Sequence, residues 1–352
     1  KRSSHIRSWP AIMAAPNLLS LPAFFSAVFV FYWSLPIVTL CGNMNFLLFK
    51  GPRSDMYTWA RGLKRFFRLR IVKYGKNSLY KAGPVLFLCN HRSWADFFVD
   101  TYLTEGTASL MSRWLVFWVF PFFISAVIVL KGIVLFKRGV VADKEKFNAG
   151  VDEKLKASPV SGLLVYPEGT RNVKPGSLPL KRGMLYYAHS RAMPVQLIIT
   201  KNKEGVLGEK TQCATWGLTL VTGFSKVLPT AGTEFEEFWQ SVQLEWDRLW
   251  QEVHAADAAG LPEVVHDNVP LYDYSHEIRV NMCAVTSASM VGLLVALLIV
   301  DKVLFLVTGF AGLLVQKVLL AGLLIWLVSS FVNSSIGVKE QKTQPQSIRN
   351  GN

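Results

Sequence analysis

The sequence predicts an α/β domain with a mixed sheet flanked by helices, joined to apolar helices at both ends of the chain. Short apolar runs that end in polar turns recur through the middle of the chain and alternate with helical patterns, which is typical of α/β domains. Long uncharged runs lie near both ends. With 352 residues, of which 51% are hydrophobic, the chain is long enough for one sizeable domain and membrane segments.

The first apolar run lies within residues 8–49, which contain no charged side chain. Its core, residues 18–40, is apolar enough to cross about 30 Å of hydrocarbon and too long for the core of a signal peptide. We therefore expect residues 1–50 to form a membrane anchor. Pro22 and Pro36, near the ends of the core, leave a re-entrant hairpin as the alternative.

Basic residues are frequent in the next segment, residues 51–82, where aromatic and leucine side chains lie between them. This pattern fits an amphipathic helix on the membrane surface, and it equally fits a solvated basic face that packs on the domain. The excess of cations after the anchor places the domain on the cytosolic side of the membrane. The net charge of +14 indicates an anionic membrane surface, whereas the long uncharged runs argue against nucleic acid.

A histidine and an aspartate follow the apolar run 85–89, which predicts a buried strand. His91 and Asp96 can meet only if His91 precedes a helix and Asp96 lies in its first turn, because this spacing on one helix would separate them by about 140°. Ser93 and Asp96 have the spacing of a capping box, which predicts that strand–turn–helix arrangement. Histidine takes a proton near neutral pH, and a carboxylate on its other nitrogen fixes the tautomer. The alternative is an ordinary turn histidine and a helix cap.

Polar groups also follow two other predicted strands. Residues 163–171 place an acid, a hydroxyl and a guanidinium around Gly169, and residues 131–138 end in cations. Strands that end in such groups suggest one site at a sheet edge, with cations gathered to bind an anion. The candidate residues are Arg138, Glu168, Gly169, Thr170, Arg171 and Lys181.

In order and spacing, these motifs resemble those of the membrane-bound glycerolipid acyltransferases, which acylate lysophosphatidic acid and its relatives. The matching blocks are residues 90–96, 132–138, 166–171 and 192–195. The first and third blocks are highly specific together, whereas the other two are weak alone. Lys137 stands where the family often has an acid, which leaves the head group of the acceptor open.

The resemblance implies an acyl-CoA-dependent transfer to the sn-2 hydroxyl of lysophosphatidic acid, which gives phosphatidic acid. His91 would remove the hydroxyl proton and Asp96 would orient His91. Arg138, Arg171 and Lys181 would hold the substrate phosphate. Glu168 would orient Arg171 or the glycerol hydroxyl, and Pro194 would open a strand that lines the acyl site. We expect no metal and no cofactor besides acyl-CoA as co-substrate.

Several alternatives remain open at this point. The acceptor is otherwise lysocardiolipin, lysophosphatidylcholine or glycerol 3-phosphate, and a transacylase that needs no CoA uses the same pair. A catalytically silent membrane scaffold is the rival from another class. The family default places the chain in the endoplasmic reticulum, with its domain facing the cytosol.

The other segments complete the predicted organisation. The acyltransferase domain is expected over residues 83–275, with helices at 114–130, 143–156 and 234–254 and further strands at 195–200 and 216–222. Residues 276–338 are expected to form a transmembrane hairpin with spans near 281–300 and 312–332. Residues 339–352 are polar, which predicts a disordered tail.

Overall fold

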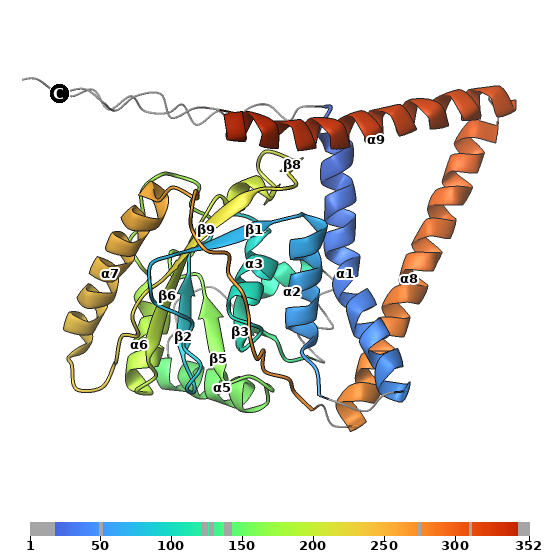
Figure 1. Ribbon diagram of the computed structural model, residues 1–352. Coiled ribbons are helices and arrows are strands. Elements are labelled where there is room, and N and C mark those ends of the chain that lie inside the picture. The colour runs from blue at the N-terminus through green and yellow to red at the C-terminus, as the bar shows by residue number, and fades with distance from the viewer. Residues whose placement is uncertain are drawn as a thin grey trace, which may run out of the picture.

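The computed structural model shows an α/β domain beside a group of long helices (Figure 1). The structure describes residues 18–48, 52–120, 126, 130–136, 143–273, 276–309 and 312–343. The predicted disordered tail begins inside a helix, because residues 339–343 belong to the helix Gly312–Thr343, so the prediction is wrong for these residues. Residues 344–352, Lys137 and Arg138 lie outside the described residues.

Within the described residues, seven strands form one mixed sheet in the order β1-β9-β6-β2-β5-β3-β4. Neighbouring strands from β6 to β4 are parallel, and β9 pairs with β6 in the antiparallel direction. The strand bounds are β1 (Arg70–Tyr74), β2 (Leu86–Cys89), β3 (Ala108–Arg113), β4 (Ile133–Phe136), β5 (Gly162–Val165), β6 (Val195–Lys201) and β9 (Thr219–Phe224). A short pair, β7 (Leu207–Gly208) and β8 (Cys213–Ala214), lies outside this sheet.

Helices cover both faces of the sheet. The helix bounds are α1 (Leu21–Leu48), α2 (Asp55–Phe66), α3 (Asp96–Leu103), α4 (Trp114–Val119), α5 (Lys144–Lys156), α6 (Arg182–Ser190), α7 (Phe235–Ala255), α8 (His276–Gly309) and α9 (Gly312–Thr343). A short 3₁₀ helix, η3 (Lys203–Gly205), follows β6.

Strand β2 shows how the two cores are divided, because successive side chains of a strand point to opposite faces. Phe87 and Cys89 belong to the core under α1, α2 and α3. Leu86 and Leu88 belong to the core under α5, α6 and α7. All four residues are completely buried, which explains why this strand is a continuous apolar run in the sequence.

The structure confirms several predicted elements. Helix α5 covers the predicted 143–156 segment, and its cap Asp143 accepts a hydrogen bond of 2.9 Å from the Lys146 amide. Strands β2, β4, β5, β6 and β9 overlap their predicted segments, and β9 ends two residues later than predicted. Helix α7 overlaps the predicted 234–254 segment and buries Trp246 and Trp250 in the core.

The basic segment is not one amphipathic helix. Only α2 is helical, and it buries Trp59 and Leu63 in the core. Residues 70–74 instead form strand β1, which pairs with β9, so the sheet begins before residue 83. Alternating side chains explain this correction, since Ile71 and Val72 enter opposite cores while Arg70 stays exposed.

The prediction of one helix over residues 114–130 is also wrong. Helix α4 ends at Val119, and Phe120 leaves the helical conformation with φ −123° and ψ 70°. Pro121 follows directly, and a proline disfavours helical geometry in the residue before it. Strand β3, which precedes α4, had not been expected from the sequence.

Three long helices lie beside the domain (Figure 1). Helix α1 continues through Pro36 without forming the alternative hairpin, and it packs against α2, α8 and α9. Among the described residues, one segment is long and apolar enough to cross a membrane, Leu21–Val38. Lys317–Val332 in α9 is apolar but shorter. Membrane crossing by α8 and α9 therefore stays a prediction.

Candidate active site

The candidate site begins where β2 ends. Asn90, the next residue, exchanges two hydrogen bonds of 2.9 Å with the backbone of Thr200 on the neighbouring strand β6. An asparagine side chain can replace a backbone pairing in this way because it carries both a donor and an acceptor. This exchange fixes the start of the turn that carries His91.

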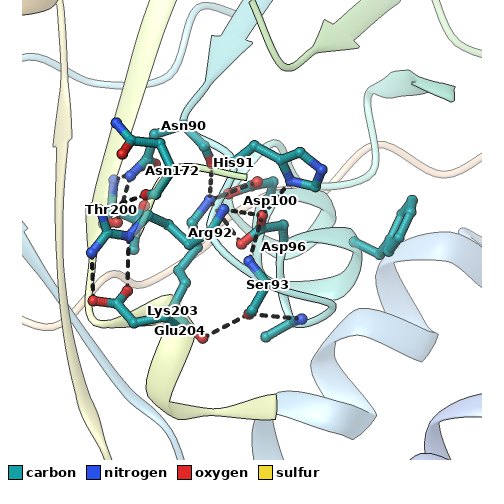
Figure 2. A network of polar contacts seen from close by, with 12 residues as sticks. Asn90, His91, Arg92, Ser93, Asp96, Asp100, Asn172, Thr200, Lys203 and Glu204 are labelled. Carbon is teal, nitrogen blue, oxygen red and sulfur yellow. Dashed lines mark hydrogen bonds and ion pairs between the residues drawn. The ribbon is translucent and has the colours of Figure 1, made fainter. Parts of the chain in front are cut away.

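His91 and Asp96 are in direct contact. The His91 Nδ1 atom lies 2.6 Å from Asp96 Oδ2, with Asp96 in the first turn of α3 (Figure 2). The Asp96 side chain is fully buried, whereas 16% of the His91 side chain is exposed. The buried acid therefore holds one ring nitrogen, and the other nitrogen, Nε2, is left for a ligand.

The turn between the two residues organises the Asp96 carboxylate. Asp96 Oδ2 also accepts backbone hydrogen bonds from Arg92 at 2.5 Å and from Ser93 at 3.1 Å. The Ser93 bond is the return half of the predicted capping box. The Ser93 hydroxyl, however, donates to the Lys203 carbonyl at 2.9 Å and accepts from Ala95 instead of capping α3. The helix accordingly begins later than expected, at Asp96.

The loop after β5 lies against the His91 turn. The Tyr166 ring stacks on the His91 ring with 4.3 Å between centroids and an interplanar angle of 16°. The backbone N–H of Asn172 donates a hydrogen bond of 2.7 Å to the His91 backbone carbonyl. Two segments that are distant in the sequence are thus joined at His91, as expected for neighbouring parallel strands.

Arg92 forms a second set of hydrogen bonds between the His91 turn and the loop after β5. Its guanidinium bonds both Glu204 oxygens, at 2.9 and 2.5 Å, and donates to the Asn172 carbonyl at 2.7 Å. Such a two-pronged arginine–carboxylate pair fixes orientation as well as distance. Arg92 itself is buried, so we assign it to holding the turn and not to binding substrate.

Glu168 is buried beside this contact, but it does not bond Arg171. Its Oε1 atom accepts from the Asn172 side chain at 2.8 Å and from the Leu178 amide at 3.1 Å. Its Oε2 atom is buried and has no hydrogen-bond partner in the described part of the chain. Burial raises the pKa of Glu168 above its usual value. Of the two expected roles, contact with an acceptor hydroxyl is the one this geometry leaves open.

Gly169 and Lys181 are close to each other at the next turn. Gly169 has φ +68°, a conformation that favours glycine. A Cβ atom there would lie 3.4 Å from Lys181 Cγ, so the lysine stem lies over the turn. Thr170 and Lys181 are exposed. The turn therefore presents a hydroxyl and a cation to solvent.

Arg171 is already paired with an acid that the sequence had not suggested. Its Nη1 donates to Glu209 Oε1 at 2.8 Å, and Glu209 lies in the β7–β8 turn. The side chains are 28% and 14% exposed, respectively. The Arg171 Nε atom is buried without a hydrogen-bond partner among the described residues. A bound anion would thus compete with Glu209 for this guanidinium.

Pro194 does not join the other candidates. It precedes β6, and its carbonyl accepts from Leu86 at the start of β2. Because β2 and β6 are parallel, Pro194 lies at the opposite end of the sheet from His91. Its expected place along an acyl site remains a prediction.

Comparison with known proteins identifies the domain. Residues 70–200 match the family model described as Acyltransferase. This segment is therefore similar to the domains of that family. It contains β1 to β6 and carries both the His91 turn and the loop after β5.

Two other known proteins are similar to this chain. A human protein named 1-acyl-sn-glycerol-3-phosphate acyltransferase beta is 25% identical over 237 residues, which are 64% of this chain and 84% of that protein. The crystal structure of the 1-acyl-sn-glycerophosphate (LPA) acyltransferase PlsC from Thermotoga maritima superposes with a TM-score of 0.50 at 17% identity. The superposition covers 68% of this chain and 97% of that chain, which supports the α/β fold described above.

The sequence did not reveal several polar residues around the candidate site. Asp100 lies four residues after Asp96, so the helical period alone could have placed the two acids on one face of α3. Lys203, Glu204 and Glu209 gave no such signal, because they follow β6 among other charged residues. Their partners are set by the packing of distant strands. No group of three or more potential metal ligands occurs among the residues that the structure describes.

Proposed function

We propose that the chain transfers an acyl group from acyl-CoA to the free sn-2 hydroxyl of lysophosphatidic acid, which gives phosphatidic acid. The contact between His91 Nδ1 and Asp96 Oδ2 carries this proposal. It provides a fixed, partly exposed imidazole that can accept a proton on Nε2. The acceptor follows from the name of the human relative and from the cations near the site.

In the proposed reaction, His91 removes the proton from the acceptor hydroxyl while that oxygen attacks the thioester carbonyl. Asp96 stabilises the imidazolium that forms. The carbon–sulfur bond then breaks, and the CoA sulfur leaves and takes the proton. No acyl-enzyme is required, because the thioester is already activated and the site can hold both substrates together.

The phosphate of the acceptor would lie against Arg171 and Lys181. Arginine suits phosphate because its planar fork matches the oxygen geometry. The buried, unpartnered Arg171 Nε provides a donor that an anion can use. The unpartnered Glu168 Oε2 would accept from a glycerol hydroxyl on the other side of the turn. Arg138 completes the proposed set of cations from a part of the chain outside the described residues.

The lipid acceptor calls for a membrane location. We propose that α1 anchors the protein and that the acyltransferase domain faces the cytosol at the endoplasmic reticulum. The apolar segment Leu21–Val38 supports the anchor, and the basic residues that follow it support the orientation. The predicted spans in α8 and α9 would return the chain to the cytosolic side.

A panel of acceptors tests this function directly. Membranes that contain the chain are given acyl-CoA with lysophosphatidic acid, lysophosphatidylcholine, lysocardiolipin or glycerol 3-phosphate, and His91→Ala is assayed in parallel. We expect His91-dependent product mainly from lysophosphatidic acid. Product mainly from another acceptor would overturn the assigned substrate, and no product from folded protein would favour a transacylase or a silent scaffold.

A further inference from the structure

A completely buried lysine lies behind the His91–Asp96 pair. Lys203 begins η3 just after β6, and its side chain has no exposed surface. Its ammonium donates to the Asn90 carbonyl at 2.7 Å and to both Asp100 oxygens at 2.9 Å (Figure 2). Lysine is almost never fully buried unless it is paired, so this arrangement requires an explanation.

The same ammonium faces the oxygen of Asp96 that His91 does not use. Lys203 Nζ lies 3.4 Å from Asp96 Oδ1, an atom with no hydrogen-bond partner within the described residues. Asp96 Oδ2 receives His91, Arg92 and Ser93. Asp96 is therefore held between the imidazole on one side and a buried cation on the other.

We propose that Lys203 is a positioning residue for the dyad, whose ammonium keeps the buried Asp96 carboxylate ionised and directed at His91. Asp100 holds this ammonium in place through its two hydrogen bonds. The inference rests on the proposed function, because it assigns Lys203 a role in that same proton transfer. Lys203 itself does not touch substrate.

The charges around Asp96 support this role. Burial alone would raise the pKa of Asp96, but the Lys203 charge and the His91 hydrogen bond outweigh burial and lower it. Burial and the Asp96 charge raise the pKa of Asp100 to about 7, against the opposing effect of Lys203. The cation thus lies between two buried acids, Asp96 and Asp100, and compensates the negative charge that is buried there.

Two other titratable groups face this cluster, and neither carries charge near neutral pH. Burial, together with the neighbouring carboxylates, raises the pKa of Tyr166 well above its ordinary value. Burial likewise raises the pKa of the Cys89 thiol. The Arg92–Glu204 pair is internally balanced and holds the turn. Lys203 is therefore the cation that faces Asp96 Oδ1.

A lysine whose charge did not act on Asp96 would affect folding without affecting proton affinity at the dyad. Removing a buried positive charge raises the proton affinity of every group near it, whether Asp96 or His91 takes the proton. The active form, with Asp96 ionised and His91 neutral, would then require a higher pH. An ammonium at this distance lowers the pKa of a carboxylate by about 1 to 3. Its removal should therefore produce a measurable shift in the pH dependence of the reaction.

The test is the pH profile of kcat/KM for Lys203→Met and Asp100→Asn in membranes. We expect the acidic limb to move upward by about one pH unit in Lys203→Met and downward by less in Asp100→Asn. Lys201→Met is the matched control, since Lys201 ends the same strand but bonds the His254 carbonyl. Its acidic limb should stay at the wild-type pH.

Unshifted acidic limbs in active, folded variants would overturn the proposal. If Lys203→Met does not accumulate, Asp100→Asn decides, because a purely structural cluster predicts no downward shift. The double variant Lys203→Met/Asp100→Asn, which removes both charges, should lie between the two. If the wild-type protein is inactive with every acceptor, the proposed function itself is refuted. If the wild-type protein is active and His91→Ala is not, the proposed function stands, and the pH profiles then test the role of Lys203 alone.

Discussion

The two halves of the site differ in how much of their geometry is fixed before any substrate binds. Asp96 is fully buried and is held by His91, two backbone amides and the buried Lys203. Arg171, in the other half, is partly exposed and is paired with Glu209, while Lys181 is exposed to solvent. The half proposed for proton transfer is thus preorganised, and the half proposed for anion binding would have to exchange partners.

This difference is consistent with separate tasks. Proton transfer gains from an orientation that needs no rearrangement during the reaction. Binding a charged head group requires access from solvent and the displacement of water or of a competing carboxylate. Substitutions in the first half should therefore reduce turnover with every acceptor, whereas those in the second half should alter the affinity for phosphorylated acceptors.

The largest effect is expected in the proton-transfer half. His91→Ala should lower kcat by roughly two to four orders of magnitude, because it removes the general base. Protein level and thermal unfolding should stay close to wild type, since the His91 ring is partly exposed. Turnover with purified enzyme is the measurement.

The matched control for that variant is His189→Ala. His189 lies in α6, and its Nε2 is 2.8 Å from the Thr233 carbonyl, so it takes no part in the site. Wild-type turnover in the control and near-wild-type turnover in His91→Ala would together remove the dyad assignment.

A smaller effect is expected from Arg171→Ala. It should raise KM for lysophosphatidic acid by about 10- to 100-fold, because a hydrogen bond to a charged group contributes about 1.5–3 kcal/mol. The kcat should change less. Arg182→Ala serves as control, since Arg182 forms an exposed pair with Glu236. An unchanged KM in Arg171→Ala would show that the phosphate binds elsewhere.

The smallest effect is expected from Glu209→Gln. Neutralising this acid frees the Arg171 guanidinium for phosphate, so KM for lysophosphatidic acid should fall by about two- to fivefold, in line with a partly exposed ion pair. Substrate titrations at one ionic strength measure this change. A higher KM would mean that Glu209 orients Arg171 and does not compete with phosphate.

The same difference between the halves explains what the sequence predicted. His91 and Asp96 come from one local turn, so an apolar run and a capping pattern were enough to show that the two could meet, and the family resemblance then predicted their pairing. Helix α5 was also predicted from a local pattern, the mixed charges of residues 143–156. Strand β1 was missed because it lies in a basic segment, whose charge fits a surface helix or a solvated basic face. Its residues Ile71 and Val72 are nevertheless buried.

The partners of Asp96 and Arg171 that were missed lie far away along the chain. Lys203 reaches Asp96 because β6 is parallel to β2 and ends beside it. Glu209 reaches Arg171 through a turn that packs outside the sheet. Such contacts depend on strand order, which local patterns do not encode. Buried charge pairs of this kind therefore require the structure.

The most direct test of the account is a kinetic comparison of His91→Ala and Arg171→Ala with lysophosphatidic acid and lysophosphatidylcholine. We predict that His91→Ala lowers kcat with both acceptors, whereas Arg171→Ala raises KM mainly for lysophosphatidic acid and so reduces the preference for the phosphate monoester. Equal losses of kcat and of acceptor preference in both variants would contradict the division of tasks between the two halves.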